Sequence, residues 1–153
     1  MKNITFILLL CCTAATFTNC NVNKRLAPYT DALTEAANAD WSAERKTEVL
    51  ALTLTKAFRE SLVFTNPKKT VQFIDRFSQQ NERNIEKIIG DLDDNLKGMN
   101  LLEKGEYFVS TARKPYIREL RSEVKKVERR IGRKINTFTI VGRFFNFLNP
   151  LKK

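Results

Sequence analysis

Few side chains in this sequence could carry catalytic or metal chemistry. The chain has no histidine, the usual general base near neutral pH and the commonest zinc ligand. Asp91, Asp93 and Asn95 match the opening of a calcium-binding loop, but Leu96 and Leu102 occupy the sixth and twelfth positions, where Gly and Glu are required. We therefore expect these acids to lie on a solvated helix face and to bind no metal.

A second short motif, Ser122-Glu-Val-Lys125, spells the S-x-x-K pattern of penicillin-binding enzymes. Its companion motifs S-D-N and K-T-G do not occur, and the five glycines are too scattered to form a phosphate-binding loop. Ser122 also falls inside a predicted helix instead of a cleft. We expect a protein that is not an enzyme and needs no cofactor.

The first twenty residues, MKNITFILLLCCTAATFTNC, have the order of a secretory signal. Lys2 gives a short positive region, residues 4–12 are apolar, and small residues follow at 13–15. The apolar run is too short for a membrane-spanning helix. The pattern predicts export.

All three cysteines, Cys11, Cys12 and Cys20, fall inside or at the edge of this segment, so the rest of the chain can form neither a disulfide framework nor a thiolate metal site. An apolar stretch that ends in a cysteine here resembles a bacterial lipoprotein signal, which implies that Cys20 becomes the acylated N-terminus. We expect a lipoprotein of the bacterial cell envelope, anchored to a membrane through Cys20. The alternative is cleavage near Ala15, which would leave Cys20 as a lone thiol in a secreted, soluble protein.

Polar and helix-starting residues divide the remaining chain. Residues 21–30 are polar and contain Pro28, which predicts a short tether before one helical domain over 31–153. A brief helix is expected over 31–38, and a longer one from Asp40 or Ser42 to about residue 64. Asn66-Pro67 predicts the start of a helix of about thirty residues that ends at Gly98.

The C-terminal third begins with an expected connection over 99–114, which contains a short β-prone run at 107–111. Lys114-Pro115 opens the next helix, whose apolar residues recur every three or four positions from Ile117 to Ile131. A last segment, 134–149, is rich in phenylalanine. Together these elements predict an all-α fold, a small bundle of three to four amphipathic helices.

Charge is distributed very unevenly along the chain, whose formal net charge is +10. Residues 1–112 hold 14 basic and 14 acidic side chains, whereas residues 113–153 hold 13 basic and 3 acidic. Two neighbouring rows on the predicted helix lie opposite its apolar seam, and only Glu123 with Lys126 and Lys125 with Glu128 offer local compensation. The basic residues of these rows are Arg118, Arg121, Lys125, Lys126, Arg129, Arg130, Arg133 and Lys134.

Two interpretations of this basic face remain open. It either keeps the protein in solution as a hydrated surface or binds an anionic partner. Nucleic acid is the usual partner of such a face, but we expect none for an exported protein. An acidic envelope protein or polysaccharide fits that compartment, which predicts a non-catalytic binding or scaffold module.

The aromatic residues near the C-terminus suggest an alternative function. Rings beside a basic helix could lie in a membrane interface and engage anionic lipid. They could equally form the last element of the core. The candidate rings are Phe138, Phe144, Phe145 and Phe147.

Overall fold

The computed structural model describes residues 22–135 and 140–149, and in these residues it contains six helices and no strand. The predicted all-α class is confirmed, although the helices outnumber the three to four expected. The expected signal segment with Cys20 lies outside the described residues, as does Phe138. In chain order the helices are residues 22–38, α2 (Ala43–Ser61), α3 (Pro67–Lys97), α4 (Leu101–Arg113), α5 (Pro115–Ile131) and α6 (Ile140–Phe147).

Residues 22–30 form the first part of a helix that continues to residue 38, and the expectation of a tether over 21–30 is wrong for them. Leu26, Leu33 and Ala36 are fully buried, and Ala37 is nearly so. These spacings of three, four and seven residues place the side chains on one face of a helix. Burial of that face stabilises the helix despite Pro28, which lies on the exposed side.

Three predicted helix starts are confirmed. Ser42 caps α2 by accepting a hydrogen bond from the amide of Arg45 at 3.2 Å. Asn66 caps α3 in the same way, and proline follows at the first helical position. Proline also begins α5 after Lys114. Such boundaries depend on local chemistry, so a single sequence is enough to find them.

Residues 101–113 form helix α4, and the connection with a β-prone run expected there is wrong. A capping box begins the helix: Asn100 accepts from the amide of Glu103, and the Glu103 carboxylate accepts from the amide of Asn100. Tyr107 and Phe108 then pack against the hydrophobic core from the helix. The cap and these contacts outweigh the β preference of the local sequence.

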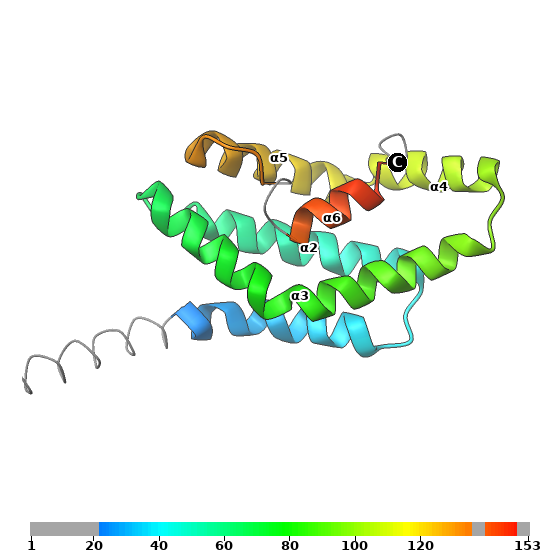
Figure 1. Ribbon diagram of the computed structural model, residues 1–153, viewed down its shortest axis with the longest axis horizontal. Helices are drawn as coiled ribbons and strands as arrows, with labels where there is room; N and C mark the ends of the chain where they lie inside the picture. Colours follow the sequence, from blue (N-terminus) through cyan, green and yellow to red (C-terminus); the bar gives the residue numbers. More distant parts are fainter. Residues whose placement is uncertain (1–21, 136–139, 150–153) are drawn as a thin grey trace, which may run out of the picture.

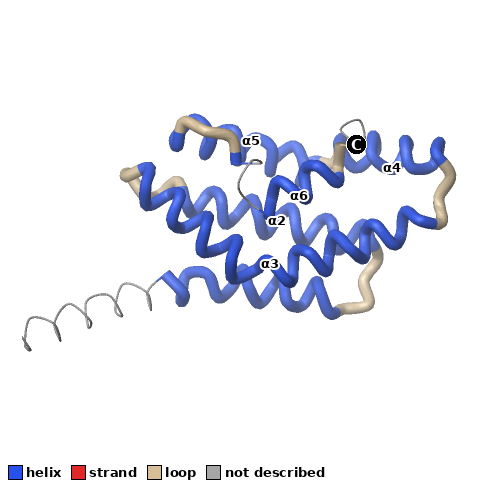
Figure 2. Tube along the Cα trace, in the orientation of Figure 1, coloured by secondary structure: helices blue, strands red, loops and turns tan. Residues whose placement is uncertain are grey.

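Helix α2 lies at the centre of the bundle and packs against both α3 and α5, as Figures 1 and 2 show. The first helix runs along the lower edge of the view, α4 and α5 follow one another along the upper edge, and α6 packs on α3. With 19 residues, α2 is about 28 Å long and separates two ends of the molecule. One end carries Trp41, and the other carries the α2–α3 turn of residues 62–66.

Candidate anion-binding surface

Helix α5 presents the predicted basic residues to solvent because its apolar seam fixes its rotation. Ile117, Leu120 and Val127 are fully buried against the core, and Val124 is 8% exposed. The helix ends at Gly132, whose φ of 73° is left-handed and suits glycine. All eight predicted cations, from Arg118 to Lys134, are exposed.

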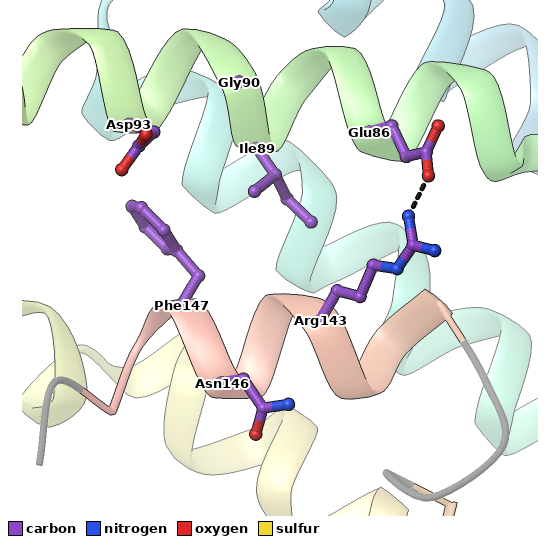
Figure 3. Close-up of a pocket in the computed structure, with 7 residues that line it drawn as sticks. All are labelled: Glu86, Ile89, Gly90, Asp93, Arg143, Asn146 and Phe147. Atoms are coloured by element: carbon purple, nitrogen blue, oxygen red, sulfur yellow. Dashed lines mark hydrogen bonds and ion pairs between the residues drawn. The ribbon is translucent and has the colours of Figure 1, made fainter. Parts of the chain in front are cut away.

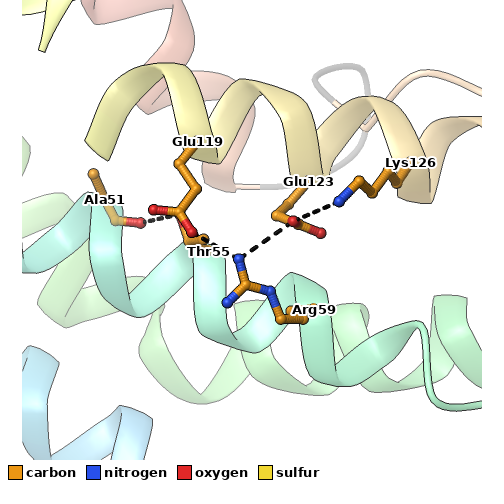
Figure 4. A network of polar contacts seen from close by, with 6 residues as sticks. All are labelled: Ala51, Thr55, Arg59, Glu119, Glu123 and Lys126. Atoms are coloured by element: carbon orange, nitrogen blue, oxygen red, sulfur yellow. Dashed lines mark hydrogen bonds and ion pairs between the residues drawn. The ribbon is translucent and has the colours of Figure 1, made fainter. Parts of the chain in front are cut away.

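One part of this basic face is neutralised inside the protein, on the side of α5 that faces α2 (Figure 4). Glu123 is 4% exposed and accepts from Lys126 at 2.8 Å and from Arg59 at 3.3 Å. Arg59, on α2, also pairs with Glu119 at 2.7 Å. The predicted Glu123–Lys126 pair is therefore present, within a larger network that joins two helices.

These cations set the protonation of Glu123. The hydrogen bond from Lys126 lowers the pKa of the Glu123 carboxyl, burial opposes that shift, and the hydrogen bond from Arg59 adds to it. The net direction is downward, so the carboxylate stays ionised at neutral pH. The Lys126 ammonium is consequently paired with the Glu123 carboxylate of the same protein.

Three other predicted cations also interact within the chain. Arg130 donates from Nη1 to the carbonyl of Phe64 at 2.9 Å. Lys134 pairs with Glu128 at 3.1 Å, and the same carboxylate accepts from the amide of Ile135. Glu128 thus binds the residues that follow the helix and does not pair with Lys125 as expected. Arg133 likewise has an interaction within the protein.

The remaining four cations form a row that we call the α5 cation stripe: Arg118, Arg121, Lys125 and Arg129. At 100° per residue they fall within about 80° of the helix circumference, on the side away from the buried Leu120 and Val127. None forms an ion pair with any described residue, and every Asp and Glu of the chain lies within the described ranges. The stripe is thus an exposed line of positive charge that no acidic side chain of the protein neutralises.

The C-terminal aromatic residues take different positions. Phe144 is fully buried, Phe147 is 9% exposed and stacks edge-on against Phe108, and Phe145 is half-buried against the same core. Of the two interpretations, the core position therefore holds for Phe144 and Phe147. A small bundle needs such large rings to fill its interior.

The acids of the calcium-like motif point to no metal site. Asp91 pairs with Lys46 of α2 at 2.5 Å, while Asp93 is exposed. Leu92 and Leu96 are buried in the core, as the helical interpretation predicts. Within the described residues, no group of three or more Cys, Asp or Glu side chains could hold a metal ion.

A shallow depression between α3 and α6 is also lined by charged side chains (Figure 3). Glu86 and Arg143 form an ion pair with each other at one end, and Asp93 lies at the other beside Phe147. The two carboxylates stand on different turns of α3, and the arginine already occupies one of them. The depression therefore lacks the converging, unpaired acids and bases that a catalytic pocket needs.

Sequence reasoning missed Arg59 and Glu119, the long-range pair that joins α2 to α5 beside the buried Glu123. The i,i+3 spacing of Glu123 and Lys126 is visible in the sequence, but Arg59 lies more than sixty residues away.

Among the helices that the structure describes, none has the length and apolar character of a membrane span. Comparisons with protein families, curated proteins and solved structures find nothing that matches this chain.

Proposed function

We propose that this protein is a non-catalytic binding module that docks an acidic protein or polysaccharide on the α5 cation stripe. The observation that carries the proposal is the contrast between the two sides of α5. Lys126 and Arg130 are held by the protein's own oxygens, whereas the stripe has no such partner. A purely solubilising surface would need no such alignment along about three helical turns.

Like charges spaced four residues apart also favour a partner. Arg121, Lys125 and Arg129 repel one another by roughly 0.2–0.5 kcal/mol for each i,i+4 pair in an isolated helix. An anionic ligand relieves that repulsion and gains the attraction of several cations together. A linear polymer with regularly spaced carboxylates fits a straight row of this kind.

The proposal places the module outside the cytoplasm, in a bacterial cell envelope. The support is the order of residues 1–20, with a positive start, an apolar run and then Cys20. An acyl anchor on Cys20 would keep the basic surface beside a membrane and concentrate it near envelope polymers. The intact mass of membrane-extracted protein tests this part, because it reports both the cleavage site and any acyl chain.

Equilibrium binding to polyglutamate and to polygalacturonate tests the stripe, with neutral dextran as the negative control. The variant R121Q/K125Q/R129Q should bind either polyanion about tenfold more weakly, at roughly 0.5 kcal/mol for each exposed contact. The matched control K56Q/R83Q/K104Q removes the same charge from cations that make no ion pair with a described residue. An equal loss of polyanion affinity in the two variants would mean that the stripe acts only through the net charge of the protein, and it would contradict the proposal.

A further inference from the structure

Cations from three separate parts of the chain come to the end of the bundle formed by the α2–α3 turn, and this turn lies at the left of Figure 1. Val63 in this turn is 69% exposed, although it is a large apolar side chain. Lys68 and Lys69 follow it at the start of α3, Arg25 comes from the first helix, and Arg130 comes from the last turn of α5. We call this set the basic end: Lys24, Arg25, Val63, Lys68, Lys69 and Arg130.

Phe64 fixes the arginines of the basic end against the turn. The guanidinium of Arg25 lies 6.0 Å from the centre of the Phe64 ring, and Arg130 donates to the Phe64 carbonyl at 2.9 Å. The ring itself packs on Phe73, with 5.7 Å between centroids. The turn is thus held from three helices, and exposed Val63 is part of a defined surface.

Acidic side chains offset little of this charge. Arg25 lies 4.0 Å from Glu60, but Glu60 also accepts a hydrogen bond from the Tyr29 hydroxyl, and burial together with this carboxylate raises the pKa of Tyr29 to about 12. Lys24, Lys68 and Lys69 form no ion pair in the part of the chain that the structure describes. That part includes all 17 acidic side chains.

Lys68 and Lys69 at the start of α3 do not stabilise the helix that they begin. They occupy the first turn of this helix, where the helix dipole disfavours cations, and the turn contains no acid. Asn66 already caps the helix by accepting from the amide of Lys68 at 2.9 Å. An external anion at this end would remove an unfavourable interaction that the protein otherwise retains.

We propose that the basic end rests on an anionic phospholipid surface, with Lys24, Lys68 and Lys69 on the lipid phosphates and Val63 in the interface. An exposed apolar side chain close to several cations is the usual pattern of a peripheral lipid contact. The first helix has its Val22 end on this side, as the Arg25–Phe64 contact shows, and Cys20 precedes Val22 by only two residues. The inference rests on the membrane location in the proposed function, but it does not need the α5 cation stripe.

The single tryptophan of the chain makes the test specific to one end of the molecule. Trp41 lies at the opposite end of α2, about 28 Å from the turn. The full-length variant W41F/V63W moves the fluorophore to the basic end, at a position exposed enough to accept the larger ring. The wild type and this variant are each mixed with vesicles of phosphatidylcholine alone or of phosphatidylcholine and phosphatidylglycerol in equal parts, with circular dichroism as the folding check.

On the anionic vesicles, the emission of W41F/V63W should shift to the blue and be quenched by brominated lipid, whereas the Trp41 emission of the wild type should change little. Adding K68Q/K69Q to W41F/V63W should weaken this response about tenfold or more, given the attraction of each cation to an anionic surface. Adding K56Q/R83Q, or R121Q/K125Q on the α5 cation stripe, should leave the response nearly intact.

Three results would overturn the inference: unchanged emission of vesicle-bound W41F/V63W, an equal response of Trp41 in the wild type, or the same shift on neutral vesicles. The proposed function fails separately from this inference. If the protein does not bind the polyanions but W41F/V63W still responds to anionic vesicles, the result contradicts the proposed function alone.

Discussion

Glu123 is the residue that removes Lys126 from the cations of α5 available to a partner. Its carboxylate is nearly buried and accepts from Lys126 and Arg59 at once. A buried carboxylate without such partners would be costly, so the pairs are required by the fold. Lys126 therefore belongs to the connection between α2 and α5, and we do not include it in the binding surface.

Replacing Glu123 should destabilise the protein in a pH-dependent way. E123Q removes the charge that binds Lys126 and Arg59, and we expect it to lower the free energy of unfolding at pH 7 by about 1–2 kcal/mol. The lowered pKa of Glu123 makes its contribution present above its ordinary pKa of 4.5 and lost as pH falls through the folded value, because the unfolded chain takes up this proton first.

Urea unfolding at pH 7 and at pH 3 measures this effect. The stability difference between the wild type and E123Q should shrink at pH 3. The variant E106Q changes an exposed acid on α4 that makes no ion pair with a described residue, and it should be nearly neutral at both pH values. A difference between wild type and E123Q that stays the same at both pH values would mean that the ion pairs contribute nothing.

At the scale of elements, the first helix is the feature that the sequence conceals most. Its composition is polar and it contains proline, yet Leu26 and Leu33 are fully buried. Polar contacts on α3 accompany this burial: Gln80 donates to Asn23 at 2.8 Å, and Asn84 donates to Thr34 at 2.9 Å. The helix is therefore a structural part of the bundle, attached to α3 by both kinds of contact.

The variant L26A distinguishes a packed helix from a tether. Removing a fully buried leucine side chain should cost roughly 2–5 kcal/mol of unfolding free energy, because it loses buried apolar surface and leaves a cavity. In urea titrations the exposed K24A should change stability by less than about 0.5 kcal/mol. A midpoint for L26A equal to that of K24A would instead support the tether.

Most element boundaries could be predicted because their causes are local. Asn66-Pro67, Lys114-Pro115 and Ser42 each start a helix through capping or backbone restriction within a few residues. Helix α4 also starts with a local signal, the capping box of Asn100 and Glu103, which the sequence analysis missed; its packing on the core through Tyr107 and Phe108 depends on residues distant in sequence. The rotation of α5 was predictable in the same way, and so was the helix over residues 31–38, whereas residues 22–30 of that helix were expected to be a tether.

The candidate surface was only partly predictable for the same physical reason. Helical spacing alone finds the eight cations and places them opposite the apolar seam, because charge and periodicity are properties of neighbouring residues. Lys126 and Lys134 are held by nearby carboxylates, those of Glu123 and Glu128, whereas Arg130 is held by the Phe64 carbonyl, which is distant in sequence. Helical spacing therefore finds the eight candidates, and the contacts in the structure separate out the four of the α5 cation stripe.

At the scale of the whole molecule, the positive charge is arranged in two surfaces. Helix α5, which carries the α5 cation stripe, runs along the upper edge of the bundle in Figure 1, and the α2–α3 turn, which belongs to the basic end, lies at the left. Contact of the basic end with a membrane would leave the side of the bundle that carries the stripe open to a second partner. A net charge of +10 also accelerates the approach of either anionic partner at low ionic strength.

Side-chain NMR of the arginines tests the central claim most directly. During titration of the full-length protein with hexaglutamate, the guanidinium signals of Arg118, Arg121 and Arg129 should shift together and saturate, and added salt should reverse the shifts. The signals of Arg59 and Arg130, which are already held by Glu119, Glu123 and the Phe64 carbonyl, should stay near their starting positions. Equal shifts at every arginine, or shifts confined to residues outside the stripe, would contradict a specific binding surface on α5.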